Sequence, residues 1–394
     1  MVKVIRPAIA IAAYNRQSAL QRLLNALDLA DYTGYQDITL IISIDRSEVN
    51  PIDDLVASPV QKVADSFTWR WGEKKVIYHE RHLGLTPNIL FCGDLSEEYD
   101  AVIVLEDDLI VSPGFYQYAC AAIEFYRDRD YVAGISLYSD IYNEYAQMRF
   151  IPLDDGYDNY FLQIAASWGQ IWTKQQWLPF RSYYKQSIER VFDKADTIPE
   201  FVISWPDPKD WKKHFIRYLV DTQRYFVVPR SSLSTNCGEQ GTHIMSKHGN
   251  YHTYLLWGTK QFQFSSLEES RAVYDCHYEI SAKILQQANP KLRDYDFTVD
   301  FYGSKNLSKI STPYVLTVRD SQNAIASFAA ELVPPELNIT FDLAGEFFHL
   351  SVVANCSNYT TQKKLAHYIY LHQYGGIKRY LALGMYSWWQ KLQS

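Results

Sequence analysis

The residues of this chain best suited to chemistry are three consecutive acids, Glu106, Asp107 and Asp108, in the stretch VIVLEDDLIV. They directly follow the apolar run from Val102 to Leu105, which is typical of a buried parallel strand. Carboxylates crowded at a strand end repel one another unless a cation binds there, and Mg²⁺ or Mn²⁺ typically links one or two of them to substrate phosphates. The alternative is that the acids cap a helix beginning near Ser112. We favour a metal site, because a cap needs one acid and not three.

The elements around this motif alternate between strand and helix. The apolar runs predict strands at residues 7–13, 38–44, 75–79 and 102–105, with helical periodicity between them. This alternation implies right-handed crossovers and a mostly parallel α/β sheet covered by helices on both faces. In such sheets ligands bind beyond the carboxyl ends of the strands. Because Arg16, Asp45 and Asn88 fall at these ends, we expect one cleft to collect them with the acids.

The chain lacks the usual glycine motifs for phosphate binding. Neither GxxxxGK[ST] nor GxGxxG occurs in this half, which argues against a P-loop NTPase and a dinucleotide-binding oxidoreductase. A nucleotide is therefore expected to be held through its metal ion, its ribose and its base edge. Asp45 is placed to accept hydrogen bonds from a ribose or a uracil. Its alternative role is to cap the following turn.

A glycine-spaced segment, NCGEQGTH, runs from Asn236 to His243. Its glycines let backbone approach a ligand closely, so Thr242 and His243 are candidate donor-binding residues. His243 can reach a phosphate or the metal, and it can equally be structural.

Composition and charge restrict the class of protein. The chain has 394 residues and a net charge of −7, so it lacks the basic field of a nucleic-acid-binding protein. Its five cysteines are widely spaced without a CxxC pair, which indicates reduced thiols and no zinc site. The start predicts a first strand and not a signal peptide, and no stretch approaches the ~18 apolar residues of a membrane span. We expect a cytoplasmic protein.

The sequence pattern changes near Gln263. We expect a first domain over residues 1–262 and a C-terminal α+β accessory or acceptor module over residues 263–394. The module ends in an amphipathic helical stretch, from Gln362 to Leu392, that combines tryptophans with basic residues. Such a helix can lie at the inner face of a membrane as a peripheral contact, and it can equally dock at the end of a domain.

The segment VIVLEDDLIVSPGFYQY resembles the metal motif of GT-A fold glycosyltransferases, and within them of the N-acetylglucosaminyltransferase I type. That motif is a Val/Ile run followed by Glu-Asp-Asp-Leu and then a Pro and a Phe. Similar segments are the opening strand with Arg16, ISID at Asp45, SWGQIW, the region around Asp210, and GEQGTH. The resemblance extends from residue 4 to residue 250. It implies a GT-A type, Rossmann-like sheet in a nucleotide-sugar-binding and catalytic domain.

The resemblance also implies roles for single residues. Asp108 is the direct metal ligand, and Glu106 and Asp107 contact the sugar and the ribose. Arg16 and Asp45 hold the uridine.

For the catalytic base the resemblance leaves three candidates. The family carries Trp-Asp-Asp-Trp where this chain has Pro-Lys-Asp-Trp, so Asp210 is the nearest counterpart, Asp207 is a rival and Glu239 is a third. The alternative role of Asp210 is an N-cap for the helix that begins near Trp211.

The expected function is that of a metal-dependent, inverting glycosyltransferase. It would move a hexosyl or N-acetylhexosaminyl group from a UDP-linked nucleotide sugar to a hydroxyl of a glycan or lipid-linked acceptor in polysaccharide synthesis, with Mn²⁺ or Mg²⁺ as cofactor. Two alternatives stay open. A non-catalytic carbohydrate-binding protein can use the same fold, although the intact acidic triplet argues against it. A sugar-phosphate nucleotidyltransferase usually needs a glycine-rich basic loop after the first strand, and AAYNRQ is not such a loop.

Overall fold

The computed structural model describes residues 5–46, 58–193, 197–237 and 252–357, and five separate positions near the C-terminus, Lys364, Ala366, Gly384, Met385 and Trp389. The chain divides into two compact units. The first comprises Met1–Asn143, Pro152–Gly238 and Asn250–Tyr278, and the second comprises Glu144–Ile151, Glu239–Gly249 and Glu279–Ser394.

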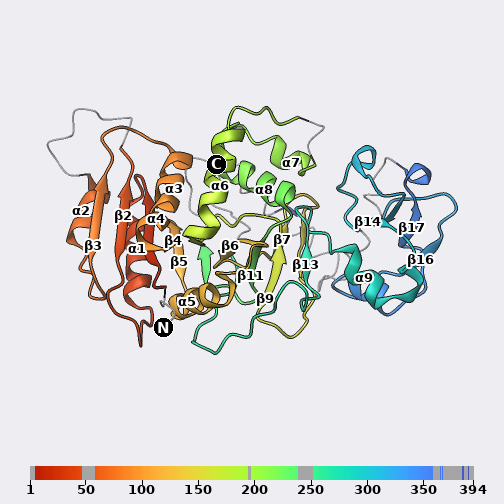
Figure 1. Cartoon of the computed structure of the whole chain (residues 1–394), viewed down its shortest axis with the longest axis horizontal. Coiled ribbons are helices and arrows are strands. Elements are labelled where there is room, and N and C mark those ends of the chain that lie inside the picture. Colours follow the sequence, from red (N-terminus) through yellow and green to blue (C-terminus); the bar gives the residue numbers. More distant parts are fainter. Residues whose placement is uncertain are drawn as a thin grey trace. The chain divides into compact units, whose positions relative to one another are not determined.

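A nine-stranded sheet forms the centre of the first unit (Figure 1). Its strands are β1 (Ala8–Ala13), β2 (Leu40–Ile44), β3 (Lys74–Tyr78), β4 (Ala101–Glu106), β6 (Val132–Ser136), β9 (Asn159–Leu162), β10 (Gln170–Thr173), β11 (Tyr225–Pro229) and β13 (Val273–Tyr274). They lie in the order β13-β9-β11-β6-β10-β4-β1-β2-β3. The neighbours β4, β1, β2 and β3 are parallel, and β11 is parallel to β6. The predicted mostly parallel sheet is therefore confirmed.

Strand β10 interrupts the parallel order. It lies antiparallel between β4 and β6, and Gln170 pairs with both Val104 and Ser136. Because β10 runs opposite to β4, the residues that precede β10 lie at the sheet edge where β4 ends. The sequence did not predict this strand, since its short Trp-rich segment has no clear period.

The expected boundary between residues 262 and 263 does not coincide with the division into units. Residues 263–278 belong to the first unit, because β13 pairs with β9 in the main sheet. The pattern change near Gln263 marks the end of the regular strand–helix alternation and not the end of the first unit.

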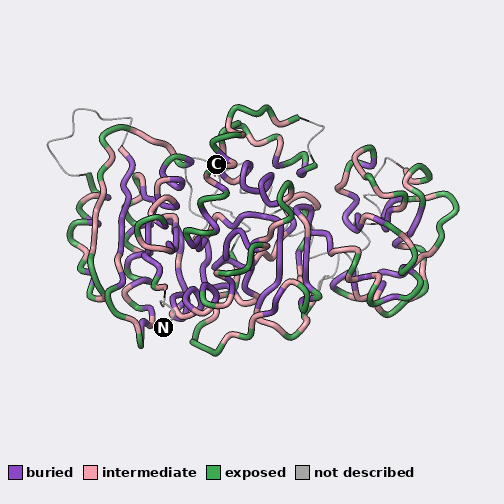
Figure 2. Tube along the Cα trace, viewed as in Figure 1, coloured by how far each residue is buried: buried purple, intermediate pink, exposed green. Residues whose placement is uncertain are grey.

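The first unit contains helices, several of which pack apolar side chains against the main sheet. They are α1 (Gln17–Asp28), α2 (Pro59–Ser66), α3 (Leu85–Asp94), α4 (Ser96–Tyr99), α5 (Phe115–Tyr126), α6 (Lys174–Ser187), α7 (Glu200–Ile203) and α8 (Trp211–Thr222). In α1 the buried leucines recur at helical spacing at Leu20, Leu23, Leu24 and Leu27. In Figure 2 the central strands are mostly buried, and exposed residues gather on the outer sides of helices and in loops.

The strand order reverses between β1 and β4. The chain passes from β1 through β2 to β3 on one side and then returns to place β4 on the other side of β1. Such a reversal opens a crevice at the carboxyl ends of the two diverging strands, and ligands of α/β sheets bind there. Glu106 ends β4 at this point, and Tyr14 follows β1.

A short two-stranded sheet follows the acids. Strand β5 (Leu109–Val111) pairs antiparallel with β12 (Ser234–Asn236). Helix α5 begins only at Phe115, its N-cap is Gly114, and no side chain caps it. The alternative role of the acids as a helix cap is therefore wrong, because strand β5 intervenes.

The second unit contains strands and helices, as expected of the C-terminal module. A four-stranded sheet has the order β14 (Phe297–Asp300), β15 (Tyr314–Thr317), β17 (Phe348–Val352) and β16 (Ala326–Phe328), with helices α9 (Ala282–Ala288) and α10 (Glu336–Thr340). A buried ion pair joins Asp300 to Arg319, whose Nε lies 2.9 Å from Asp300 Oδ2. Most of the predicted helix from Gln362 to Leu392 lies outside the described residues. Within the described ranges no helix combines the length and apolarity needed to cross a membrane.

Candidate active site

Arg16 connects the two aspartates of the acidic motif. Its Nη1 donates to Asp108 Oδ2 at 2.7 Å, and its Nη2 donates to Asp107 Oδ1. The backbone N–H of Tyr14 donates to Asp107 Oδ2 at 3.3 Å. The structure therefore brings Arg16 to the acids, as expected from their common position at the sheet edge. Its contact with a uridine stays a prediction.

The acids carry more negative charge than their surroundings neutralise. Burial and repulsion from Asp108 and Asp107 raise the pKa of Glu106 to about 8. Burial also raises the pKa of Asp107 to about 6, although the charge of Arg16 opposes this shift. Raised carboxyl pKa values at the end of one strand indicate a site that favours an additional cation.

Asp108 offers an oxygen atom that fits a metal ion. The residue is 5% exposed, and its Oδ2 accepts from Arg16. Its Oδ1 is buried and has no hydrogen-bond partner within the part of the chain that the structure describes. A buried carboxylate oxygen without a donor is costly, and binding to a cation would remove that cost.

The described residues do not form a complete protein-only metal cage. Across them, no three His, Cys, Asp or Glu side chains gather as a metal site. Proteins commonly hold Mg²⁺ or Mn²⁺ through one or two carboxylates while substrate phosphates and water complete the shell. The role of Asp108 as a metal ligand stays a prediction.

Asp45 fastens the loop that leads into α3. Its Oδ1 accepts from the backbone N–H groups of Arg46 and Leu83 at 2.8 and 2.7 Å. Its Oδ2 accepts from the N–H of Gly84 at 2.9 Å and lies 3.0 Å from His82 Nδ1. The structure thus gives Asp45 a role in holding this loop against the end of β2. Its predicted contact with a ribose or uracil is untested.

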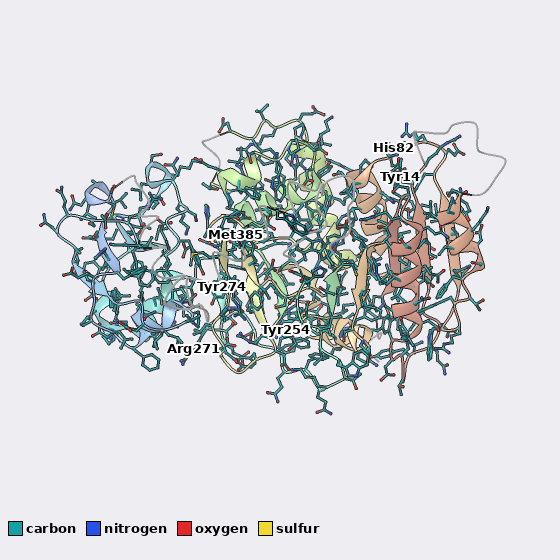
Figure 3. All side chains as sticks on the ribbon, turned by 180° about the vertical axis from the view of Figure 1, so that it is seen from behind. Tyr14, His82, Tyr254, Arg271, Tyr274 and Met385 are labelled. Carbon is teal, nitrogen blue, oxygen red and sulfur yellow. The ribbon has the colours of Figure 1, made fainter. Side chains whose placement is uncertain are left out.

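Two aromatic rings face each other at the same edge of the sheet. The centroids of Tyr14 and His82 are 5.3 Å apart with the rings tilted by 49° (Figure 3). Tyr14 adjoins the acids through its N–H, and His82 adjoins Asp45. The two rings therefore connect Asp107, beside Tyr14, with Asp45, beside His82. The sequence alone did not predict this contact between the rings.

Asn88 is buried and serves the packing of α3. Its Oδ1 accepts from Ser43 Oγ at 2.6 Å, and Ser43 Oγ lies 2.8 Å from His79 Nε2. Since the single hydroxyl proton goes to Asn88, Ser43 accepts from His79 Nε2–H. These contacts join β2 to α3, and a contact of Asn88 with the donor stays a prediction.

Two of the candidate bases lie in the turn before α8. Asp210 is the N-cap of that helix, and its Oδ1 accepts from the N–H of Lys213 at 2.8 Å. Burial raises the pKa of Asp210, and the N–H of Lys213 and the charge of Lys212 oppose the rise. Asp207 is exposed, and its Oδ1 accepts from the N–H of Lys209 at 2.8 Å. The cap role of Asp210 is confirmed, and it leaves the carboxylate able to accept a proton.

Lys212 is a further residue of the site that the sequence did not predict. Its positive charge acts on both Glu106 and Asp210, so one ammonium group lies within electrostatic range of the metal motif and of the candidate base. A lysine two positions after an acid in a polar, Trp-rich segment carries no distinctive pattern. Only the packing of α8 against the main sheet reveals it.

The first described residues of the glycine-spaced loop adjoin the acids. The N–H of Cys237 donates to the backbone oxygen of Asp108 at 3.1 Å. Three predicted residues of this loop lie outside the described residues: Glu239, Thr242 and His243. Their roles stay predictions.

Comparison with known proteins gives a family for the first half of the chain. Residues 8–201 match the family model described as Glycosyl transferase family 2. Among curated proteins no sequence matches the chain.

Several solved structures are similar at low identity. A mannosyltransferase, PcManGT, from Pyrobaculum calidifontis in complex with GDP-Man and Mn²⁺ has 11% identity and a TM-score of 0.30, with 44% of this chain and 46% of that chain covered. Residues 1–349 of TarS from S. aureus in complex with UDP-GlcNAc have 13% identity and a TM-score of 0.35, with 61% of each chain covered. The chain therefore spans between 46% and 61% of the length of these two proteins.

The family match covers β1 to α6, and so includes the strand reversal and the acids that follow β4. Residues 8–201, just under half of the chain, are therefore similar to family 2 glycosyltransferases, and the main sheet with its helices has a GT-A-like fold.

Proposed function

We propose that the protein is a metal-dependent, inverting glycosyltransferase that transfers a sugar from a UDP-linked donor to an acceptor hydroxyl. The observation that carries the proposal is Asp108, whose Oδ2 is held by Arg16 while its buried Oδ1 has no partner in the described residues. This atom lies at the strand reversal of the region that is similar to family 2 glycosyltransferases, where the donor diphosphate is expected. The narrower resemblance to the N-acetylglucosaminyltransferase I type, including the Glu-Asp-Asp motif, is part of the proposal.

In this reaction Asp108 would hold the metal ion, and Arg16 fixes the orientation of Asp108. The ion would neutralise negative charge on the diphosphate leaving group. Tyr14 and His82 offer ring faces beside the acids for the uracil. Asp210 accepts the acceptor hydroxyl proton while the new oxygen–carbon bond forms at the sugar and the bond from sugar carbon to phosphate oxygen breaks. UDP leaves with the electrons of that bond.

Donor hydrolysis tests the proposal. UDP-GlcNAc, other UDP-sugars and GDP-Man are incubated with the full-length protein, with Mn²⁺ and with EDTA, and the released nucleotide is measured. We expect release from a UDP-sugar that requires Mn²⁺, and NMR of the first-formed sugar should show the inverted anomer. Release that is unaffected by EDTA would contradict a metal-dependent reaction, and the retained anomer would contradict inversion.

The binding of Mn²⁺ with UDP is expected to strengthen as the pH rises from 6 to 8. Glu106 and Asp107 have raised pKa values of about 8 and about 6, so the folded metal-free protein binds more protons in this range than the unfolded chain. Its stability should therefore fall as the pH rises through this window, and metal binding should release protons. Calorimetric titration in two buffers of different ionisation enthalpy measures that release. If the affinity for Mn²⁺ with UDP did not depend on pH, the raised pKa values of Glu106 and Asp107 would be contradicted.

We also propose that the C-terminal segment recognises a lipid-linked acceptor or the membrane that carries it. The support is the basic and aromatic composition of residues 362–394. Deleting these residues is expected to lower transfer to a lipid-linked acceptor more than it lowers donor hydrolysis. Equal loss of both activities, in a protein that still melts cooperatively, would refute this division of roles.

A further inference from the structure

A row of aromatic rings leads from the end of β4 to the surface of the first unit. Trp168, Trp205 and Phe201 form this aromatic row, and Lys212 lies between the two tryptophans. The Nζ of Lys212 is 5.6 Å from the ring centroid of Trp168 and 5.7 Å from that of Trp205. The ring of Phe201 follows, with its centroid 6.2 Å from that of Trp205 and the two planes at 84°. The row is therefore continuous, although its members come from three segments of the chain.

The inner end of the aromatic row is fixed at the carboxyl end of β4. Trp168 lies two residues before the start of β10, which runs antiparallel to β4 with Gln170 opposite Val104. Trp168 therefore lies at the edge of the sheet where β4 ends in the acids. Ser234 Oγ donates to the backbone oxygen of Trp168, and the ring of Tyr138 packs edge-on against the indole with the centroids 4.8 Å apart. These contacts restrict the position of the Trp168 ring.

The outer end of the aromatic row is fixed by helix α8. The Nζ of buried Lys213 donates to the backbone oxygens of Ile203 and Trp205 at 3.2 and 2.8 Å. These bonds join α7 and the turn after it to the start of α8 (Figure 1). Trp205 is only half-buried, and Phe201 is 44% exposed. Rings that are fixed in this way and still reach solvent can pack against a ligand at a low cost in conformational entropy.

Lys212 has hydrogen-bonding capacity left in the middle of the row. Its Nζ donates to Ser167 Oγ at 3.2 Å, which is its only hydrogen bond among the described residues. An ammonium group carries three N–H donors, so two are available to water or to a ligand. The two indole rings attract the ammonium group and restrict where it lies. Lys212 can therefore donate to oxygen atoms of a ligand that packs along the aromatic row.

The sheet topology separates the aromatic row from the expected nucleotide site. Arg16 and Asp45, which are expected to hold the nucleotide, follow β1 and β2, whereas Trp168 precedes β10 on the other side of β4. In an inverting displacement the acceptor attacks the sugar from the side opposite the leaving group. Asp210, the proposed base, is the N-cap of α8, and Lys212 belongs to the first turn of the same helix. The row therefore begins beside the proposed base, on the side where an acceptor is expected.

The chemistry of the row fits a chain of sugars. A pyranose ring has a face of C–H groups that packs on an aromatic ring, and hydroxyl groups at its rim that accept from an ammonium group. The successive spacings along the row are together longer than one sugar ring. A single sugar beside Asp210 would therefore contact only the inner end of the row, and Trp205 and Phe201 would contact the sugars that follow.

We propose that the aromatic row and Lys212 form an extended acceptor site, which binds a carbohydrate chain of two or more sugar units and selects the acceptor by its length. The inference rests on the proposed function, since it takes the transfer reaction to occur beside Asp210. The sugar that is attacked lies beside Trp168 and Lys212. The following sugars pack against Trp205 and Phe201.

Saccharide binding to the full-length protein tests the inference. Monosaccharides and linear di-, tri- and tetrasaccharides of glucose, mannose, galactose and N-acetylglucosamine are titrated by calorimetry, with and without UDP and Mn²⁺. In at least one series we expect the trisaccharide to bind about tenfold or more tightly than the monosaccharide. Phe201→Ala and Trp205→Ala should each weaken trisaccharide binding about five- to tenfold, because an aromatic contact is lost, and should leave monosaccharide binding nearly unchanged.

Three further variants make the assignment specific. Trp257→Ala is the matched control, because Trp257 is a tryptophan of the first unit that is 84% exposed and lies outside the row, and we expect normal binding. Trp205→Phe keeps an aromatic ring and should restore part of the trisaccharide affinity. Lys212→Met should weaken the binding of monosaccharide and trisaccharide alike, since Lys212 lies at the inner end of the row. Thermal melts show which variants fold, and exposed Phe201 still tests the row if Trp205→Ala does not fold.

Several results would overturn the inference. They are equal affinity for mono- and trisaccharides, unchanged trisaccharide affinity in folded Phe201→Ala, an equal loss in Trp257→Ala, and the absence of saccharide binding. A phenyl monosaccharide that binds as tightly as the trisaccharide would also overturn it, because the rings would then receive an apolar aglycone. Binding needs no turnover, so the two proposals fail separately. Length-dependent binding without sugar transfer contradicts only the proposed function, and transfer without length dependence contradicts only this inference.

Discussion

Replacing Asp108 by Asn is expected to abolish the metal-dependent binding of UDP while the melting temperature barely changes. The substitution removes the charge of the one acid whose Oδ1 is buried without a partner in the described residues. It removes no volume, and the remaining amide oxygen can still accept from Arg16. Losing an outer-shell partner of a metal ligand typically costs 10–100-fold in affinity, so losing the ligand itself should cost about 100-fold or more. Calorimetric titration of UDP with Mn²⁺ measures the effect.

The matched control for this experiment is Asp100→Asn. Asp100 directly precedes the other end of β4, and its φ of 63° is one that Asn adopts readily. The control carries the same chemical change, but it lies before the amino end of β4, whereas Asp108 follows its carboxyl end. We expect this variant to bind UDP with Mn²⁺ normally. Unchanged affinity in Asp108→Asn, or an equal loss in Asp100→Asn, would rule out a metal site at Asp108.

Asp210→Asn should lower turnover by a factor of ~10² or more, because an amide cannot accept the acceptor proton. Donor affinity and melting temperature should barely change, since Asn is as good an N-cap as Asp and can still accept from the N–H of Lys213. Steady-state kinetics of donor hydrolysis, with calorimetry of UDP binding and a thermal melt, separate the two roles.

Two further variants make the assignment of the base specific. Asp210→Ala removes both the cap and the base, so it should lose turnover to the same extent and in addition about 1 kcal/mol of stability. Asp207→Asn alters the exposed rival in the same turn and should keep normal turnover. Near-normal turnover in Asp210→Asn would show that another residue is the base. Loss of turnover in Asp207→Asn alone would identify Asp207 as the base.

The sequence by itself determined the part of the fold that local patterns encode. Continuous apolar runs predicted β1, β2 and β4, because a strand that is buried on both faces is apolar throughout. The leucine spacing predicted α1, because a helix that is buried on one face repeats its apolar residues with helical periodicity. The acids were recognised as a site because three charges after a buried strand are too costly to be incidental. The position of Arg16 at the same edge followed from the rule for parallel strands, and its contact with Asp108 agrees with it.

Only the tertiary structure decided which distant segments complete the site. The insertion of β10 between β4 and β6 brings Trp168 to the acids, although these residues are far apart in the chain. The packing of α8 lets the charge of Lys212 act on Glu106. The loop before α3 and the neighbouring Arg46 give Asp45 four partners. These contacts correspond to no local periodicity or motif in the sequence. The pairing of short strands and the position of a single side chain depend on contacts between distant segments. Such contacts form only when the whole sheet is assembled, so they cannot be read from neighbouring residues in the sequence.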